Sequence, residues 1–372
     1  MTERAAHAVR VIDTGLAAGA YNIAFDQALI DLHRAGTIPD TLRFLRFTPS
    51  ALIGRHQILA HEIDIEFCRA RGIAIARRIT GGGALYLDGD QLGWELVCRR
   101  KRFGALSLAA VGERICTAAA VGLTTLGVPV RFRPRNDLEV DGRKIGGTGG
   151  FYDGDTLFFQ GTFLLGLDSA TMFEVLRVPA AKRARRPDAS PAARVIGLRD
   201  LLGSATPDIA AVRSALSRGL AAELGLELVD DVVGSAESAH AAHLQASELG
   251  TWDFIDALPA TRGQIHGSAT RTTPGGTVHA QVRLHDRGEP CIASVTVSGD
   301  FFVTPPRLVF DLEAMLRDQR VAMIESVVAE HFARHRPELL SIDAAVLAEV
   351  VREAAVAAVE SRVQSECVAA AD

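Results

Sequence analysis

The sequence predicts an α+β fold: a mixed β-sheet flanked by helices, then a small α/β domain and a C-terminal helix. Helical and strand-like patterns follow one another without strict strand–helix–strand alternation, which favours a mixed sheet over a parallel one. Near residue 246 the sequence pattern changes: alternating apolar and polar residues, separated by turn residues, replace the longer helical patterns. We expect a first domain at 1–245, a second at 246–330 and a helical tail at 331–372.

The first domain combines amphipathic helices with short apolar strands. Apolar residues at helical spacing predict helices over 21–35, 61–71, 108–126 and 206–224. Short apolar runs predict strands over 42–47, 51–54, 73–75, 84–86, 94–97, 138–140 and 157–165. Three prolines and a run of basic residues predict a loop over 179–194.

The second half begins with a β-meander over 264–302. Its turns are indicated by Thr273-Pro274-Gly275-Gly276 and by Asp286-Arg287-Gly288. Helical patterns follow over 308–316 and 321–332, and the apolar face of 344–363 predicts an amphipathic helix that packs on its own domain.

Composition excludes several classes of protein. The 372 residues are 48% hydrophobic and 23% charged, which is typical of a globular chain. No apolar run reaches about 18 residues, and the residues Met1-Thr2-Glu3-Arg4 lead into no apolar signal core, so we expect a cytoplasmic protein without membrane contact. The net charge of −5 gives no drive toward nucleic acid. Five scattered cysteines without a Cys-x-x-Cys pair indicate reduced thiols.

The first glycine-rich cluster is Arg77-Arg78-Ile79-Thr80-Gly81-Gly82-Gly83-Ala84. Successive glycines allow positive φ and close approach, so their N–H groups can converge on an anion. The neighbouring arginines add donors suited to phosphate or carboxylate. A hairpin with solvated arginines is the plainer alternative for the same residues.

The second cluster runs from Arg135 to Gly150. Its Asp141-Gly142 pair predicts a tight hairpin, with Lys144 at the start of the second strand and flexible glycines after it. Only three of the 40 basic residues are lysines, so a lysine inside a motif stands out. A compact ammonium can follow charge that develops on a phosphoryl oxygen, and Asp137 with Asp141 could hold Mg²⁺. A lysine after a hairpin can equally be a solvated surface residue.

Together these stretches resemble the lipoate–protein ligase A family over about residues 15–205. The likeness rests on four segments in the family's order: Ile53-Gly54-Arg55-His56-Gln57 with Glu62, Arg77 to Asp88, Asn136-Asp137-Leu138 through Lys144-Ile145, and Gly161-Thr162-Phe163-Leu164-Leu165. The segment 252–316, with Gly299-Asp300-Phe301-Phe302, is similar to the family's small accessory domain.

The resemblance implies a biotin/lipoate-ligase-like catalytic domain that works in two steps. ATP and lipoate, or octanoate, form an acyl-AMP, and the acyl group passes to a lysine of a lipoyl-domain protein. Lys144 would be the catalytic residue, Arg78, Gly83 and Lys144 would bind lipoate, and Asp137 would bind the magnesium ion. The residues implied to bind ATP and the acyl-adenylate are Arg78, Gly82, Gly83, Ala84, Leu85, Tyr86, Asn136, Asp137 and Lys144.

Two alternatives share these residues. An octanoyl or lipoyl transferase of the same fold moves acyl groups between carrier proteins without ATP. That reaction needs a cysteine at the pocket that forms a thioester. Only Cys98 and Cys116 are near enough to the glycine clusters in sequence, and both lie in segments predicted to be a buried strand or helix. A non-catalytic lipoyl-domain assembly protein would keep the pocket without turnover. The sequence leaves open the acceptor protein, the lipoate or octanoate preference, the oligomeric state and the role of the C-terminal helix.

Overall fold

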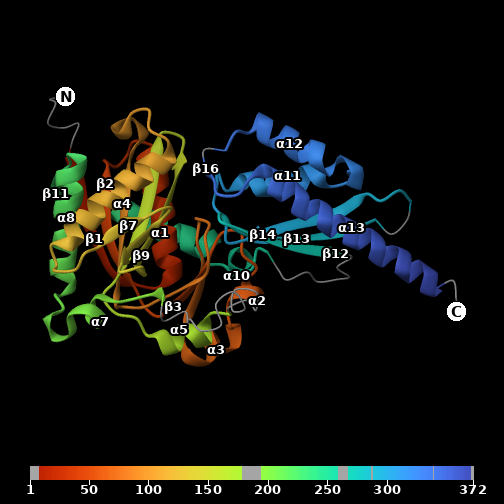
Figure 1. Cartoon of the computed structure of the whole chain (residues 1–372). Coiled ribbons are helices and arrows are strands. Elements are labelled where there is room, and N and C mark those ends of the chain that lie inside the picture. Colours follow the sequence, from red (N-terminus) through yellow and green to blue (C-terminus); the bar gives the residue numbers. More distant parts are fainter. Residues whose placement is uncertain (1–7, 178–193, 259–266, 286–287, 338, 370–372) are drawn as a thin grey trace. The chain divides into compact units, whose positions relative to one another are not determined.

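The computed structural model describes residues 8–177, 194–258, 267–285, 288–337 and 339–369. It forms two compact units (Figure 1). The first comprises Met1–Leu52, Ile63–Arg77 and Leu85–Ile255, and the second Ile53–Glu62, Arg78–Ala84 and Asp256–Asp372. Almost all of the loop predicted over 179–194, and two residues of the turn predicted at 286–288, lie outside the described residues.

An eight-stranded mixed sheet forms the centre of the first unit, in the order β11-β1-β2-β6-β10-β9-β8-β7. Strand β1 runs parallel to β2 and β11, and the remaining neighbours are antiparallel, which confirms the predicted mixed sheet. The strands are β1 (Ala8–Ala17), β2 (Thr41–Phe47), β6 (Gln91–Arg99), β7 (Arg131–Arg133), β8 (Asp137–Val140), β9 (Arg143–Asp153), β10 (Thr156–Leu164) and β11 (Glu227–Asp230). A small sheet adds β3 (Ser50–Ile53), β4 (Ala74–Arg77) and β5 (Leu85–Leu87).

Two long helices of the first unit pack closely against each other. These are α4 (Leu108–Thr124), which contains Gly122, and α8 (Ile209–Leu224), which contains Gly219. A Cβ on Gly219 would lie 2.5 Å from the Cα of Gly122, so only glycine allows this close packing. The described helices of the first unit are α1 (Gly19–Arg34), α3 (Ile65–Arg71), α4 (Leu108–Thr124), α5 (Ser169–Val175), α7 (Leu198–Leu202), α8 (Ile209–Leu224), α9 (Ser235–Leu244) and α10 (Trp252–Ile255).

The single helix predicted over 61–71 is instead two helices, α2 (Leu59–Glu62) and α3. The side chain of Asp64 accepts a hydrogen bond from the backbone N–H of Phe67 at 2.9 Å. An aspartate in this position caps a new helix N-terminus, so it separates the two.

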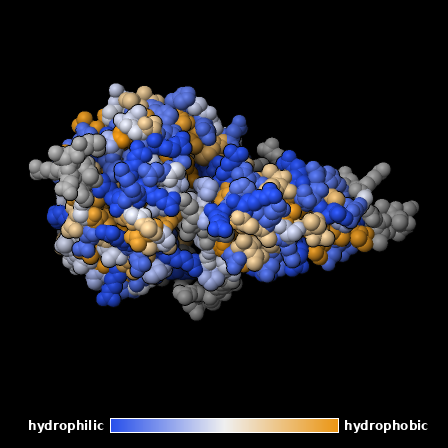
Figure 2. Space-filling view, turned by 90° about the horizontal axis from the view of Figure 1, so that it is seen from above, coloured by the Kyte–Doolittle hydropathy of each residue, from blue (hydrophilic) through white to orange (hydrophobic). Residues whose placement is uncertain are grey.

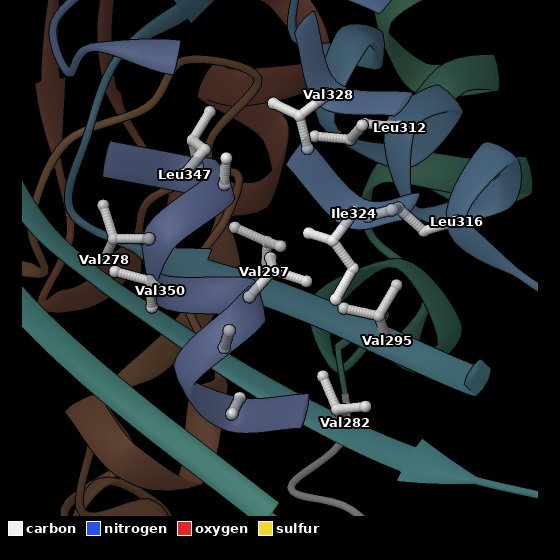
Figure 3. Close-up of a cluster of buried hydrophobic side chains, with 14 of the residues drawn as sticks. Val278, Val282, Val295, Val297, Leu312, Leu316, Ile324, Val328, Leu347 and Val350 are labelled. Carbon is white, nitrogen blue, oxygen red and sulfur yellow. The ribbon is translucent and has the colours of Figure 1, made fainter. Parts of the chain in front are cut away.

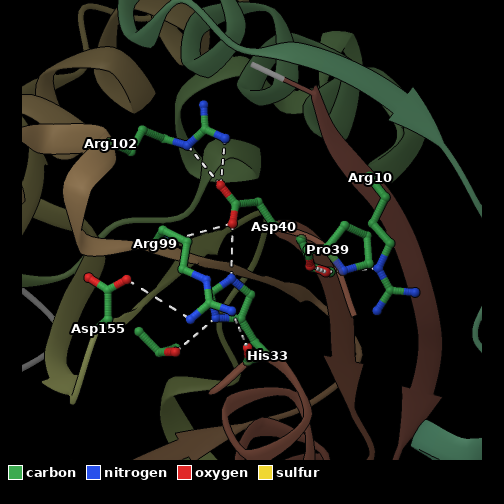
Figure 4. Close-up of polar contacts among 9 residues, drawn as sticks. Arg10, His33, Pro39, Asp40, Arg99, Arg102 and Asp155 are labelled. Atoms are coloured by element: carbon green, nitrogen blue, oxygen red, sulfur yellow. Dashed lines mark hydrogen bonds and ion pairs between the residues drawn. The ribbon is translucent and has the colours of Figure 1, made fainter. Parts of the chain in front are cut away.

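A polar cluster around Asp40 connects helix α1 to the sheet (Figure 4). His33 lies 2.9 Å from the Asp40 carboxylate through Nε2 and 2.8 Å from the Thr156 hydroxyl through Nδ1. Arg102 donates to the same carboxylate at 2.9 Å. Burial would raise the pKa of Asp40, but the bonds from His33 and Arg102 outweigh it and hold the pKa below its usual value. These buried polar groups therefore satisfy one another.

The second unit has a three-stranded meander, β12 (Gly267–Thr273), β13 (Gly276–Leu284) and β14 (Ile292–Gly299), as the turn residues predict. Its other elements are β15 (Val303–Thr304), α11 (Arg307–Leu316), α12 (Ile324–Arg334), β16 (Leu339–Leu340) and α13 (Ala344–Ala369).

Helix α13 belongs to the core of this second unit. Leu347 and Val350 on α13 lie beside Val278 and Val297 of the meander (Figure 3). Described residues of the stretch predicted as a separate tail, 331–372, thus share a core with β12, β13 and β14. The packing also departs from the predicted limits in the first half, because 53–62 and 78–84 pack with the second unit.

Over the described residues, no helix is long and apolar enough to cross a membrane. Apolar residues are scattered among hydrophilic ones on the face seen in Figure 2. The larger exposed apolar side chains include Val232 and Trp252.

Glu313 of α11 makes the stability of the second unit depend on pH. Burial raises the pKa of Glu313 to about 7, while a 2.7 Å bond from the Val297 N–H opposes the rise. Because the folded-state pKa exceeds the unfolded one, the contribution of Glu313 to stability is most favourable below about pH 4.5 and is lost as pH rises toward 7.

We expect Glu313→Gln to remove this pH dependence, since a neutral amide occupies the same place. Calorimetry of the full chain at pH 5.5 and 8.5 should show that the stability of the variant relative to wild type is greater at pH 8.5 than at pH 5.5, by on the order of 1–3 kcal/mol. An equal difference at both pH values would contradict the assignment.

Candidate functional site

The predicted hairpin around Asp141-Gly142 is present between β8 and β9. Asp141 and Gly142 have φ of 50° and 76°, the positive values of a two-residue hairpin turn. The glycines after Lys144, expected to be flexible, instead continue β9 as an ordered strand. The reason is close packing, because a Cβ on Gly146 or Gly150 would lie 2.5 Å from a backbone oxygen of β10.

Lys144 forms an ion pair with Asp137 across this hairpin. Its Nζ lies 2.7 Å from a carboxylate oxygen of Asp137, and both side chains are partly exposed. Lys144 is opposite Glu139, whereas Asp137 is opposite Gly147, with one extra residue between the two pairs. A Cβ on Gly147 would lie 2.8 Å from the Lys144 ammonium. The missing side chain of Gly147 thus makes room for the lysine to reach Asp137.

Two cations hold Asp137 ionised. Burial would raise its pKa, but Lys144 and Arg133 together outweigh burial and lower the pKa. Arg133, which donates to Asp137 at 2.7 Å, is a residue that the sequence analysis missed. Arg133 reaches Asp137 because the two residues are paired across β7 and β8. The sequence alone does not give this register, so the contact could not be predicted.

The magnesium ion expected at Asp137 stays a prediction. Among the described residues, no group of three or more histidine, cysteine or carboxylate side chains is arranged to hold a metal ion. The Asp137 carboxylate is paired with Lys144 and Arg133. A magnesium ion bound through this one carboxylate would share it with both cations and would take its remaining ligands from substrate and water.

Asn136 lies beside this pair and is bound to Thr148. Its side-chain amide donates to the Thr148 carbonyl at 3.0 Å, and its own carbonyl accepts from the Thr148 N–H at 2.7 Å and the hydroxyl at 3.0 Å. The Thr148 hydroxyl is also 3.2 Å from the Sγ of Cys116 on α4. A buried thiol therefore contacts the segment that carries Asn136 and Lys144.

The triglycine loop belongs to the second unit. Arg78 is buried and donates to the carbonyl oxygens of Gly81 at 3.1 Å and Gly83 at 2.8 Å. Burial lowers the pKa of Arg78 to about 10, so it remains charged at neutral pH. Gly82 has a φ of 93°, which only glycine adopts readily. The arginine thus fixes the shape of the loop from within.

The predicted binding residues form two groups. Arg78, Gly82, Gly83 and Ala84 lie in the second unit, whereas the others lie in the first. Leu85 and Tyr86 lie on β5, where burial raises the pKa of Tyr86 to about 12. The structure brings together Asn136, Asp137 and Lys144, and separately the residues of the loop. Their predicted roles toward a nucleotide or lipoate stay predictions.

Three cysteines of the first unit are buried. Burial raises the pKa of Cys68 and of Cys116 to about 11, and raises the pKa of Cys98 further. A nucleophilic cysteine reacts as its thiolate, so all three are poorly activated in this state. Cys116 also contacts the Thr148 hydroxyl, which lowers its pKa in opposition to burial.

The lipoyl protein ligase A/B catalytic domain model matches residues 18–221, more than half of the chain. The chain belongs to this family. An octanoyltransferase LipM of Moorella thermoacetica is 30% identical over 217 residues, 52% of this chain and 78% of that protein. Further octanoyltransferases match at 26–29% identity. Lipoate-protein ligase A subunit 1 of Thermoplasma acidophilum is 27% identical over 243 residues, 63% of this chain and 90% of that protein.

The fold has solved counterparts. A structure of an archaeal lipoylation system, a bi-partite lipoate protein ligase and its E2 lipoyl domain from Thermoplasma acidophilum, aligns with a TM-score of 0.60 at 24% identity. The alignment covers 69% of this chain and 99% of that one. At this identity the likeness shows the fold, and it confirms the predicted ligase-like architecture.

Thiol labelling should reflect the difference in burial. At pH 8 we expect an alkylating reagent to modify the partly exposed Cys291 at least about tenfold faster than Cys68, Cys98 or Cys116, whose thiols are buried and protonated. Peptide mass spectrometry over a time course measures each rate. Labelling of Cys116 as fast as Cys291 would show that this thiol is activated and reachable.

Proposed function

We propose that this protein acylates a lysine of a lipoyl-domain protein by transferring an octanoyl group from a thioester carrier. The observation that carries this choice of donor is the set of octanoyltransferases among its relatives. They favour this alternative over the ATP-dependent ligation that the sequence motifs led us to expect. The lipoyl-domain acceptor agrees with the E2 lipoyl domain named for the structural counterpart.

The chemistry is an acyl transfer from sulfur to nitrogen. The neutral acceptor amine attacks the thioester carbonyl, a C–N bond forms and the C–S bond breaks. The proton lost by nitrogen leaves with the carrier thiol, which is released. Negative charge collects on the carbonyl oxygen in the transition state, and a fixed cation nearby stabilises it. Lys144, held by Asp137, would supply that cation.

Cys116 is the candidate for a covalent intermediate. Its thiol would first take the acyl group from the carrier and then give it to the acceptor amine. The contact with Thr148 places it beside the segment of Asn136 and Lys144. Its raised pKa opposes this role unless acyl-carrier binding exposes the thiol. Direct transfer without an enzyme thioester needs no such change.

ATP-dependent lipoate ligation is the second candidate. The observation that favours it is the burial of Cys68, Cys98 and Cys116, which a ligase does not need as nucleophiles. A lipoate-protein ligase subunit is also among the relatives. In this route the lipoate carboxylate attacks the α-phosphorus of ATP and releases pyrophosphate. The acceptor amine then attacks the acyl-AMP and releases AMP, and Lys144 would offset the charge in both steps.

One experiment separates the two donors. The purified protein is incubated with an apo lipoyl domain and either octanoyl-loaded acyl carrier protein, or ATP, Mg²⁺ and lipoate. Intact-mass spectrometry follows the acceptor. We expect acylation with the carrier alone. Acylation only with ATP and the free acid, with pyrophosphate released, would establish the ligase, and acylation in neither arm would contradict both.

Cys116→Ser tests the intermediate within the same assay. If the acyl group passes through this thiol, we expect the carrier-dependent rate to fall by roughly two orders of magnitude or more, as loss of a nucleophile does. Cys68→Ser is the matched control, because that thiol is also buried and carries the same raised pKa. A wild-type rate in Cys116→Ser would leave direct transfer or ligation.

A further inference from the structure

We propose that the turn at residues 299–302 of the second unit is a positioning element for the triglycine loop, with Phe302 as its main positioning residue. The proposal concerns contacts within that unit alone. Its consequence for acyl-group binding rests on the proposed function, whereas the contact itself can be tested independently.

The 299–302 turn contacts the loop along its backbone. The N–H of Gly82 donates to the carbonyl of Phe301 at 3.3 Å. A Cβ on Gly82 would lie 2.8 Å from Cζ of the Phe302 ring, and a Cβ on Gly81 would overlap the Phe301 carbonyl oxygen. The glycines are therefore needed for this contact as well as for the positive φ of Gly82.

The same turn contacts the second motif of the unit, residues 53–57. The N–H of Gly299 donates to the carbonyl of His56 at 2.8 Å, and the buried His56 ring stacks on Phe301 with centroids 5.2 Å apart. This segment is joined to the loop by the bond from the Arg55 N–H to the Thr80 carbonyl, 2.9 Å. Both motifs therefore contact one turn.

The 299–302 turn is also held by contacts within the second unit that do not involve the loop. The Phe301 ring is fully buried in the core of the second unit. The backbone of Phe302 makes two hydrogen bonds of 2.9 Å with Ser341: its N–H donates to the Ser341 hydroxyl, and its carbonyl accepts from the Ser341 N–H. The Asp300 carboxylate accepts the Thr277 N–H at 2.6 Å. Removing the Phe302 ring would therefore leave the turn in place and remove the side-chain contact that limits the movement of Gly82.

Through this contact the second unit would affect how the triglycine loop binds a substrate. Backbone N–H groups bind an anion well only when their directions are fixed beforehand. Arg78 fixes the loop from inside, and the 299–302 turn fixes it from outside. A looser loop would bind the acyl substrate more weakly, with less effect on the rate once it is bound.

Hydrogen exchange of the full chain tests the contact without any activity. In Phe302→Ala we expect amide exchange in the peptide covering 78–84 to accelerate about tenfold, because the loop opens locally more often. Phe302→Leu should restore most of the protection. The control is Phe332→Ala, which removes an aromatic ring of the same size from the core of the second unit, where it contacts His331 on α12.

Kinetics in the acylation assay supply the second readout. For Phe302→Ala we expect KM for the acyl donor to rise about tenfold with kcat changed less than about threefold, and Phe332→Ala to keep both. Wild-type exchange in Phe302→Ala, or equal acceleration in Phe332→Ala, would overturn the positioning role. If the wild-type protein acylates nothing with either donor, the proposed function fails while the exchange comparison still decides the contact.

Discussion

The ion pair between Lys144 and Asp137 is the interaction on which the site depends. It needs a tight turn at Asp141-Gly142, an extra residue in β9 that sets the register, and a glycine at 147 over which the lysine can lie. Arg133 reinforces the carboxylate from the neighbouring strand. The result is a cation at a fixed place on the sheet, in a chain that uses arginine for most other positive charges.

Glycines have several different roles in this molecule. Gly146 and Gly150 allow the backbone of β9 to approach the backbone of β10 closely, Gly147 leaves room for an ammonium, and Gly82 adopts a conformation that other residues resist. In the triglycine loop the absent side chains admit the 299–302 turn. The flexibility usually attributed to glycine-rich segments is therefore not what these positions provide. They provide close approach, and the segments are ordered because of it.

Much of this could be predicted from the sequence. The hairpin followed from Asp141-Gly142, the meander from its turn residues, and the family from four motifs. The ordering of the glycines after Lys144 could not be predicted, because it depends on which strand lies beside β9. The packing of residues 53–62 and 78–84 with the second unit depends on contacts with Phe301 that span more than 200 positions in the chain. The choice of acyl donor could not be predicted either, since both proposed routes would use the same cation.

The central claim is that the charge of Lys144 speeds acylation whichever donor is used. The most direct test is the rate at which Lys144→Met, which has a similar length and no charge, acylates an apo lipoyl domain, followed by intact mass. The account predicts a rate at least about two orders of magnitude below wild type, as the loss of a preorganised electrostatic stabiliser causes, while thermal unfolding changes little. A wild-type rate in this variant would contradict the account.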